Sequence, residues 1–266
     1  MEINRRFWDE AVAVHVASEF YDVASFKAGR STLLPVEIDE VGDVTGRSLL
    51  HLQCHFGLDT LSWARAGARV TGVDFSREAV MTAGALASEL GIEARFVEAN
   101  VYDLPSALAE QYDIVFTSYG VLCWLPDLAQ WARIAARYVK AGGFFYMVEG
   151  HPMADSLADD ATADDLRLAY PYFGDGRPVT FDQDAGTYAD PNARLVNHRT
   201  SAYWHGLGSI VSSLIHAGLR IEFLHEFPFC AWARLPSMTR GDDGYFRLPG
   251  DDGRVPFLFS LRAQKP

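Results

Sequence analysis

The chain has 266 residues, of which 49% are hydrophobic and 22% charged, and this composition can bury the core of one large α/β domain. It carries 35 acidic and 23 basic residues, a formal charge of −12, and has no run of Lys or Arg. Because a protein that binds nucleic acid needs a basic face, we expect no nucleic acid partner. No apolar stretch is long enough for a signal peptide or a membrane span, so we expect a cytoplasmic protein that does not bind membranes.

The cysteines and histidines do not follow the spacing of a disulfide framework or a metal site. Cys54, Cys123 and Cys230 are odd in number and lie far apart in the sequence. None of them belongs to a Cys-x-x-Cys pair. No paired ligand spacing is seen among six histidines: His51, His55, His198, His205, His216 and His225. The sequence therefore predicts free thiols and no bound metal.

The first 45 residues are expected to form a helical cap. Within residues 1–30, apolar and aromatic side chains recur at helical spacing: Phe7, Trp8, Val12, Val16 and Phe20. A stripe so rich in aromatic rings suits a helix that covers a ligand. An ordinary helix packed against the main sheet explains the same stripe equally well.

Residues 46–150 alternate between strand and helix patterns. The expected strands are 48–53, 69–73, 95–98, 113–118 and 144–149. Between them lie helices, one of which is capped by Ser76 and closed by Gly91, while another follows Pro126 and is closed by Gly142-Gly143. This alternation predicts a parallel sheet covered by helices on both faces.

The alternation of strand and helix patterns ends at residues 151–205, which are rich in Asp, Gly and Pro with aromatic residues interleaved. We interpret this segment as a lid or substrate-binding insertion, whose acidic part (residues 155–184) most often forms a solvated face. Residues 206–266 then predict a helix at 207–218 and a hairpin of strands 219–227 and 255–263. With no second domain evident, residues 1–266 are expected to form a single domain.

Several strand ends resemble those of class I S-adenosylmethionine-dependent methyltransferases of the small-molecule type. His51–Gly57 matches the family's acid-x-Gly-x-Gly-x-Gly turn, although Gln53 and His55 replace two glycines and His51 replaces the acid. Asp74 stands at the end of the second strand, where the family has an acid, and residues 98–105 resemble its Gly-Asp-Ala-x-x-Leu-Pro segment. The resemblance implies a Rossmann-like, seven-stranded, mostly parallel sheet with helices on both faces.

The same resemblance implies S-adenosylmethionine as the cofactor. Asp74 would accept both ribose hydroxyls, Asn100 would bind the adenine amino group, and the Val101 N–H would face a ring nitrogen. A nicotinamide cofactor fits less well, because its pyrophosphate needs the two missing glycines. The expected cofactor-binding residues are Gln53, Cys54, His55, Gly57, Asp74, Phe75, Asn100, Val101 and Ser118.

The expected reaction is in-line transfer of the methyl group to an N or O atom of a small-molecule acceptor, by a monomer or a homodimer. Glu149 and His151 are the candidate catalytic residues, since a hydroxyl acceptor needs a base, although His151 can instead simply hydrogen-bond the lid. The candidate substrate-binding residues are Tyr21, Tyr119, Trp124 and His205. One alternative stays open: a cofactor-binding protein or a cyclase on the same fold, without methyl transfer.

Overall fold

The computed structural model describes residues 1–182 and 186–266, so Asp184 of the predicted acidic segment lies outside the described residues. The helical elements are α1 (Glu2–Ala17), α2 (Val23–Lys27), α3 (Pro35–Val41), α4 (Leu58–Arg65), α5 (Arg77–Leu90), α6 (Leu104–Ala107), η1 (Leu122–Trp124), α7 (Leu128–Tyr138), α8 (Pro152–Asp155) and α9 (Leu207–His216). The strands are β1 (Ser48–Leu52), β2 (Arg69–Asp74), β3 (Ala94–Glu98), β4 (Tyr112–Ser118), β5 (Val139–Gly150), β6 (Val179–Asp182), β7 (Arg199–Ala202), β8 (Arg220–Phe227), β9 (Thr239–Arg240), β10 (Phe246–Arg247) and β11 (Leu258–Gln264).

The main sheet has seven strands in the order β3-β2-β1-β4-β5-β11-β8. β1 pairs in parallel with both β2 and β4, and β2 pairs in parallel with β3. β11 runs antiparallel to β5 and to β8, so the predicted terminal hairpin is present. The predicted seven-stranded, mostly parallel sheet is confirmed.

The chain divides into two compact units, each built from separate stretches of sequence. The first unit comprises residues 1–33, 43–116 and 178–202, and the second comprises residues 34–42, 117–177 and 203–266. The predicted 151–205 insertion is therefore shared between the units. It also contains a pair of antiparallel strands, β6 and β7, that the sequence pattern did not indicate. The organisation as a single domain stays a prediction.

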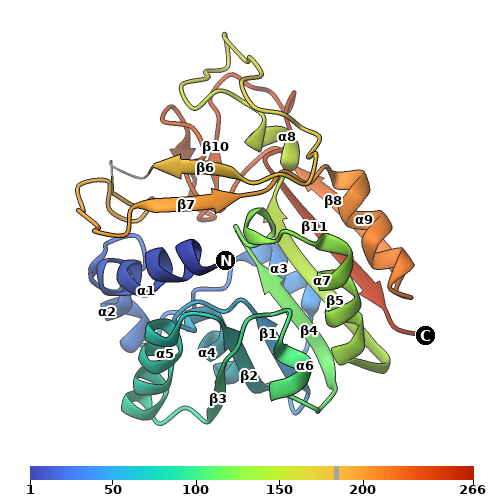
Figure 1. Ribbon diagram of the computed structural model, residues 1–266. Helices are drawn as coiled ribbons and strands as arrows, with labels where there is room; N and C mark the ends of the chain where they lie inside the picture. The colour runs from blue at the N-terminus through green and yellow to red at the C-terminus, as the bar shows by residue number, and fades with distance from the viewer. Residues whose placement is uncertain (183–185) are drawn as a thin grey trace. The chain divides into compact units, whose positions relative to one another are not determined.

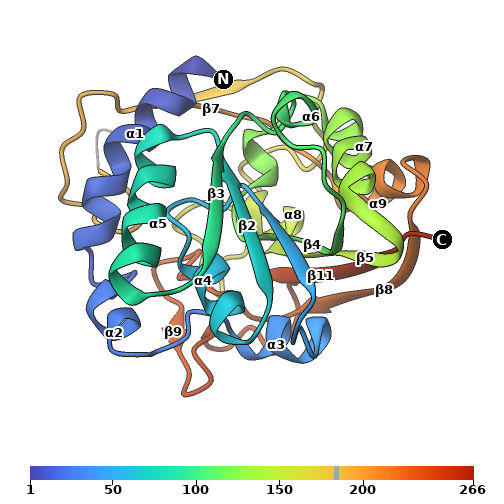
Figure 2. The same ribbon diagram turned by 90° about the horizontal axis from the view of Figure 1, so that it is seen from below.

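In the first unit, α4 packs against β2, and α5 packs against β2 and β3 (Figure 2). The apolar core between these elements includes Phe26, Phe56 and Leu61, all almost fully buried. α1 contacts α5 and also β7, beside which it lies in Figure 1. The predicted N-terminal helix thus packs on the sheet-covering helix α5 and on the hairpin formed by β6 and β7.

In the second unit, α7 and α9 lie side by side, and they pack on β5 and β8 respectively (Figures 1 and 2). α7 begins where the Asp127 carboxylate accepts a hydrogen bond from the Gln130 N–H, and it ends at Tyr138. The expectation that Gly142-Gly143 closes this helix is wrong, since β5 already begins at Val139. Both glycines hydrogen-bond through their backbones to Lys265, and this pairing explains why they extend the strand.

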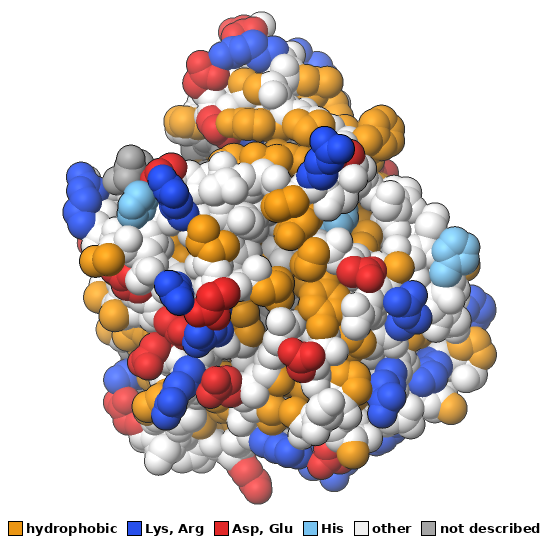
Figure 3. All heavy atoms as spheres, in the orientation of Figure 1, with side chains coloured by type: hydrophobic (Ala, Val, Ile, Leu, Met, Phe, Trp, Pro, Cys, Tyr) orange, Lys and Arg blue, Asp and Glu red, His pale blue; other side chains and the backbone are white. Residues whose placement is uncertain are grey.

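On the face drawn in Figure 3, Lys and Arg side chains lie among Asp and Glu side chains. Several charged side chains of the protein form exposed ion pairs, such as Arg5 with Glu2 and Lys27 with Glu89. Such pairs contribute little to stability, because water screens them. Within the described part of the chain, no helix is both long enough and apolar enough to cross a membrane.

Candidate active site

The turn after β1, in the first unit, has the backbone conformation of a glycine-rich loop. Gln53 and His55 have φ angles of +58° and +49°, and Gly57, which precedes α4, has a φ of +82°. Only glycine adopts this left-handed region freely, and other residues cost about 1–2 kcal/mol each. Two side-chain-bearing residues thus hold the conformation that the family obtains with glycines, and the surrounding contacts have to keep them there.

Close packing fixes this turn from behind. A Cβ added at Gly57 would lie 2.8 Å from the Phe96 ring and 2.9 Å from the Cβ of Ala83. Below the turn, the Cys54 N–H donates a 2.9 Å hydrogen bond to the Val73 carbonyl at the end of β2. The turn is therefore seated on β2 and β3, and at Gly57 only glycine fits.

Asp74, the last residue of β2, links the turn to the start of α5. One carboxylate oxygen accepts the His55 N–H at 2.8 Å, and the other accepts the Ser76 N–H at 2.9 Å. The side chain is nearly buried, and burial raises the pKa of this carboxyl to about 6. Each oxygen keeps a second lone pair, so the group can still accept hydrogen bonds from a diol.

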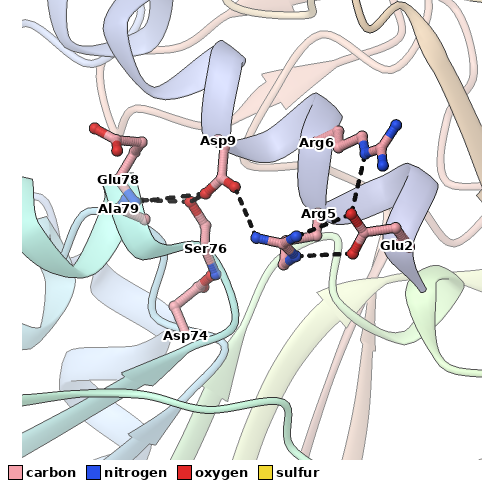
Figure 4. A network of polar contacts seen from close by, with 8 residues as sticks. All are labelled: Glu2, Arg5, Arg6, Asp9, Asp74, Ser76, Glu78 and Ala79. Carbon is pink, nitrogen blue, oxygen red and sulfur yellow. Dashed lines mark hydrogen bonds and ion pairs between the residues drawn. The ribbon is translucent and has the colours of Figure 1, made fainter.

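A polar network connects this strand end to α1 (Figure 4). The Ser76 hydroxyl donates to the Asp9 carboxylate at 2.7 Å and accepts the Ala79 N–H at 3.1 Å, which caps α5. Asp9 also forms an ion pair with Arg5 at 3.5 Å, and Arg5 in turn pairs with Glu2. The N-terminal helix is thereby attached to Ser76, which follows the predicted ribose-binding Asp74 by two positions.

Aromatic side chains from α1 and from the 186–190 segment gather on the turn. His15 Nδ1 lies 2.9 Å from His55 Nε2, so one ring donates to the other. Burial lowers the pKa of His15 to about 4 and also lowers that of His55, and both rings are therefore neutral at pH 7. Tyr21 stacks on His15 at 5.4 Å between centroids, and its hydroxyl hydrogen-bonds that of Tyr188. Tyr21, predicted to bind substrate, thus lies with the predicted cofactor residues.

The remaining predicted cofactor residues of this unit follow β2 and β3. Ala99 donates its N–H to the Asp74 carbonyl at 2.9 Å, and this bond brings the end of β3 beside that of β2. Asn100 turns the chain, since its side-chain oxygen accepts the Tyr102 N–H at 3.1 Å. Val101 is buried and Phe75 half-buried. The predicted residues from Gln53 to Val101 therefore come together in one unit.

In the second unit, Glu149 holds the turn that follows β4. Its carboxylate accepts the N–H groups of Val121 at 2.7 Å, Leu122 at 3.1 Å and Gly150 at 2.7 Å, together with a short bond from Gly120. Burial raises the pKa of this carboxyl, and the four donors lower it. All of its hydrogen-bonding capacity is engaged, so the contacts favour a positioning role over that of a base.

His151 is similarly occupied. Its Nδ1 accepts the Met153 N–H at 3.0 Å, which leaves the proton on Nε2, and Nε2 donates to Glu226 at 2.8 Å. The ring is 4% exposed, and burial lowers its pKa more than Glu226 raises it. The contacts therefore favour the alternative interpretation, in which His151 caps α8 and orders the chain after β5.

The turn after β4 carries one predicted cofactor-binding residue and the predicted substrate-binding residues of the second unit. Ser118, predicted to bind the cofactor, is buried at the end of β4. Tyr119 follows with a φ of +24°, and its N–H donates a hydrogen bond to the Val148 carbonyl. Trp124 ends the short helix η1, and His205 donates its Nε2 proton to the carbonyl of Leu125 at 2.8 Å. The prediction that Tyr119, Trp124 and His205 contact the acceptor stays a prediction, as does cofactor binding by Ser118.

The structure also brings forward residues that the sequence did not single out. Trp232 packs edge-on to Tyr119, with 6.2 Å between ring centroids, and its ring lies against the backbone of Gly150. Asp155 forms a 3.7 Å ion pair with Arg234. Nothing in the local periodicity marks Trp232 or Arg234, and Asp155 was part of an acidic run interpreted as a solvated face. Across the described residues, no cluster of three or more His, Cys, Asp or Glu forms a metal site.

Sequence comparison identifies related enzymes for part of this chain. Residues 50–147 match the methyltransferase domain family. The ubiquinone biosynthesis O-methyltransferase of Aeromonas salmonicida is 30% identical over 145 residues, which are 52% of this chain and 60% of that enzyme. The chain therefore matches about three fifths of the length of this relative.

Solved structures of low sequence identity share the fold. An S-adenosylmethionine dependent methyltransferase from Mesorhizobium loti superposes with a TM-score of 0.61 at 18% identity, covering 90% of this chain and 100% of that chain. The cyclase SpnF superposes with a TM-score of 0.51 at 16% identity, covering 92% of this chain and 80% of that chain. The fold is thus common to a methyltransferase and to a cyclase.

Proposed function

Because the chain belongs to the class I S-adenosylmethionine-dependent methyltransferases, we propose that it transfers a methyl group from S-adenosylmethionine to an N or O atom of a small-molecule acceptor. The related O-methyltransferase supports an oxygen acceptor as the first choice. The three unpaired thiols support a reducing compartment, which we propose to be the cytoplasm. We propose a monomer or a homodimer as the working form.

The observation that carries this proposal is the left-handed turn at Gln53, His55 and Gly57 with Asp74 behind it. Such a turn between a strand and a helix aims backbone N–H groups at a ligand and lets the ligand approach the main chain. The chain keeps this conformation at two positions where it is unfavourable. A strained backbone at the end of a strand is the kind of feature that ligand binding retains.

The residues at these strand ends fit the cofactor. The Asp74 carboxylate keeps acceptor capacity beyond its bonds from the His55 and Ser76 N–H groups, and ribose supplies two neighbouring hydroxyl donors. Asn100 and Val101 stand at the end of β3, where we propose that they bind the adenine edge. The cofactor brings a methyl group on a sulfonium that is already electrophilic, so the protein has to align the acceptor, exclude water and accept a proton.

For the acceptor we propose the loop system of the second unit. Tyr119, Trp124 and His205 supply aromatic and polar surfaces there, and Trp232 adds a fourth ring. Glu149 positions this loop through the four N–H groups that it accepts. We assign His151 a positioning role as well, because both of its nitrogens are used within the fold.

The second candidate is cofactor binding without methyl transfer, as in a cyclase. The similarity in fold to the cyclase SpnF supports it. Production of S-adenosylhomocysteine separates the candidates, since only methyl transfer releases that product.

The test begins with the affinity for S-adenosylmethionine and S-adenosylhomocysteine, measured by isothermal titration calorimetry. Asp74→Ala removes two charge-assisted hydrogen bonds to ribose, and we expect a loss of roughly 100-fold or more. Asp39→Ala, at an exposed position of α3, is the control and leaves the affinity unchanged. Release of S-adenosylhomocysteine is then followed with phenol, catechol and amine acceptors. Unchanged affinity in Asp74→Ala contradicts the proposed cofactor site, and binding without turnover on any acceptor favours the second candidate.

A further inference from the structure

Asp155, the last residue of α8 in the second unit, is a carboxylate with unused hydrogen-bonding capacity. Its side chain is 42% exposed, and its polar contact within the described residues is the ion pair with Arg234 Nε at 3.7 Å. That separation is too long for a hydrogen bond. Arg234 donates instead to Asp159 at 3.1 Å and to the Leu157 carbonyl at 3.3 Å. Both Asp155 oxygens therefore remain open to a ligand.

This partly exposed carboxylate is linked to the loop system proposed to bind the acceptor. Its ion-pair partner Arg234 follows Trp232 by two positions, and the Trp232 ring packs on Tyr119 and against the backbone of Gly150. Burial, opposed by Arg234 and assisted by Glu149, raises the pKa of Asp155 to about 6. An accessible carboxylate with such a pKa can accept a proton near neutral pH and release it to solvent.

The two groups first predicted to act as a base do not have this freedom. Glu149 already accepts four backbone N–H groups, and protonating it would break bonds that hold the turn after β4. His151 uses Nδ1 as an acceptor and Nε2 as a donor within the fold. Among the nearby histidines, His205 retains one nitrogen, Nδ1, that is not used in its bond to Leu125. Asp155 and His205 are therefore the two groups that a test has to separate.

We propose that Asp155 contacts the methyl acceptor and receives the proton that its nucleophilic group loses. This inference rests on the proposed methyl transfer. The acceptor is a hydroxyl compound, or an ammonium ion that first gives a proton to Asp155 and so frees its nitrogen lone pair. The O or N lone pair then forms the new bond to the methyl carbon while the C–S bond breaks, and sulfur keeps that electron pair as neutral S-adenosylhomocysteine. The proton leaves the acceptor for an Asp155 oxygen and passes from there to solvent.

Arg234 offers a matched control, because it pairs with two aspartates. Asp155→Asn and Asp159→Asn each remove one negative charge beside the same guanidinium, but Asp159 is more exposed, at 69%. The variants are compared at saturating S-adenosylmethionine, with the best acceptor from a panel of phenols, catechols and amines, between pH 5 and 8.5. Melting temperature and cofactor affinity are measured for each variant, so that a folding defect is recognised.

We expect kcat to fall on the acid side of the wild-type profile with an apparent pKa near 6, because protonated Asp155 cannot accept the acceptor's proton. Asp155→Asn lowers kcat about 100-fold or more and loses this acid limb, while its cofactor affinity stays within twofold. Asp159→Asn keeps the wild-type profile. The inference is overturned if Asp155→Asn retains both the wild-type rate and the acid limb of the pH profile, or if the acid limb is lost in His205→Asn instead.

The outcomes also separate this inference from the proposed function. If the wild type binds the cofactor but methylates no acceptor, the proposed function itself fails. If the wild type methylates an acceptor and Asp155→Asn is unaffected, only this inference is contradicted.

Discussion

The buried carboxyl of Asp74 predicts that cofactor affinity depends on pH in a specific direction. Burial raises the pKa of this group to about 6 in the free protein, so the carboxyl is mostly protonated at pH 5 and mostly ionised at pH 7. Ribose hydroxyls donate to the ionised form and lower its pKa when the cofactor binds. Binding therefore releases a proton below pH 6, and the affinity rises as the pH rises through that value.

The size of the effect follows from the free and bound pKa values. If the bound pKa returns to the ordinary value of about 3.9, one pH unit below 6 leaves roughly one tenth of the free protein ready to bind. We expect a Kd about tenfold weaker at pH 5 than at pH 7. The two neighbouring histidines do not obscure this window, because burial lowers the pKa of His15 to about 4 and lowers that of His55 as well. Asp9 is the charged neighbour that contributes to the upward shift.

Isothermal titration calorimetry at pH 5, 6, 7 and 8, in buffers of different ionisation enthalpy, measures the affinity and the proton release together. Asp74→Asn is the control, since it binds the same ligand and therefore cancels the ligand's own titration. Wild-type affinity that is flat from pH 5 to 7, or that changes in parallel with the Asp74→Asn variant, would show that Asp74 does not bind the cofactor.

Three further changes test other parts of the site. Glu149→Gln replaces an acceptor oxygen by a donor amide and leaves buried N–H groups unpaired. We therefore expect urea denaturation to show a free energy of unfolding that is lower by about 2–4 kcal/mol, whereas the control Glu222→Gln has no such effect. His55→Gly removes the backbone strain of the left-handed conformation but also removes the contact with His15. We expect calorimetry to give a cofactor Kd within about threefold of wild type. A loss of affinity of more than tenfold would mean that the imidazole binds the cofactor. Trp232→Ala removes the ring beside Tyr119, and steady-state kinetics should show the acceptor KM rising about tenfold with the cofactor Kd unchanged.

The elements of the main sheet could be predicted from the sequence because their signals are local. β1, β2, β3 and β4 begin and end within one residue of the expected positions, and α5 has the predicted Ser76 cap and Gly91 end. Gly142-Gly143 misled the prediction, since a glycine pair can end a helix or, as here, lie within a strand. The backbone pairing with Lys265 distinguishes a helix end from a position within a strand. Lys265 lies 122 residues after Gly143, so the local sequence does not reveal this partner.

The candidate site shows the same division between local and distant causes. Asp74 and Asn100 could be named because each lies within two residues of the end of a recognisable strand. The occupied state of Glu149 and His151 could not, because it depends on the turn after β4 and on Glu226 in β8. Asp155 could not be singled out for a third reason: composition alone cannot tell its partly exposed carboxylate from the more exposed aspartates near it in the sequence, such as Asp159.

The replacement of two glycines in the turn after β1 also has a structural explanation. A glycine at position 55 would have no side chain to reach α1, whereas the His55 ring contacts His15 and lies edge-on to Trp8 at 5.3 Å between centroids. Asp9 on the same helix accepts a hydrogen bond from Ser76, which follows Asp74 by two positions. α1 is thus attached to both sides of the proposed cofactor site, and part of the strain at His55 is offset by contacts that a glycine could not make. The N-terminal helix therefore takes over the stabilisation of the turn that small residues provide elsewhere in the family.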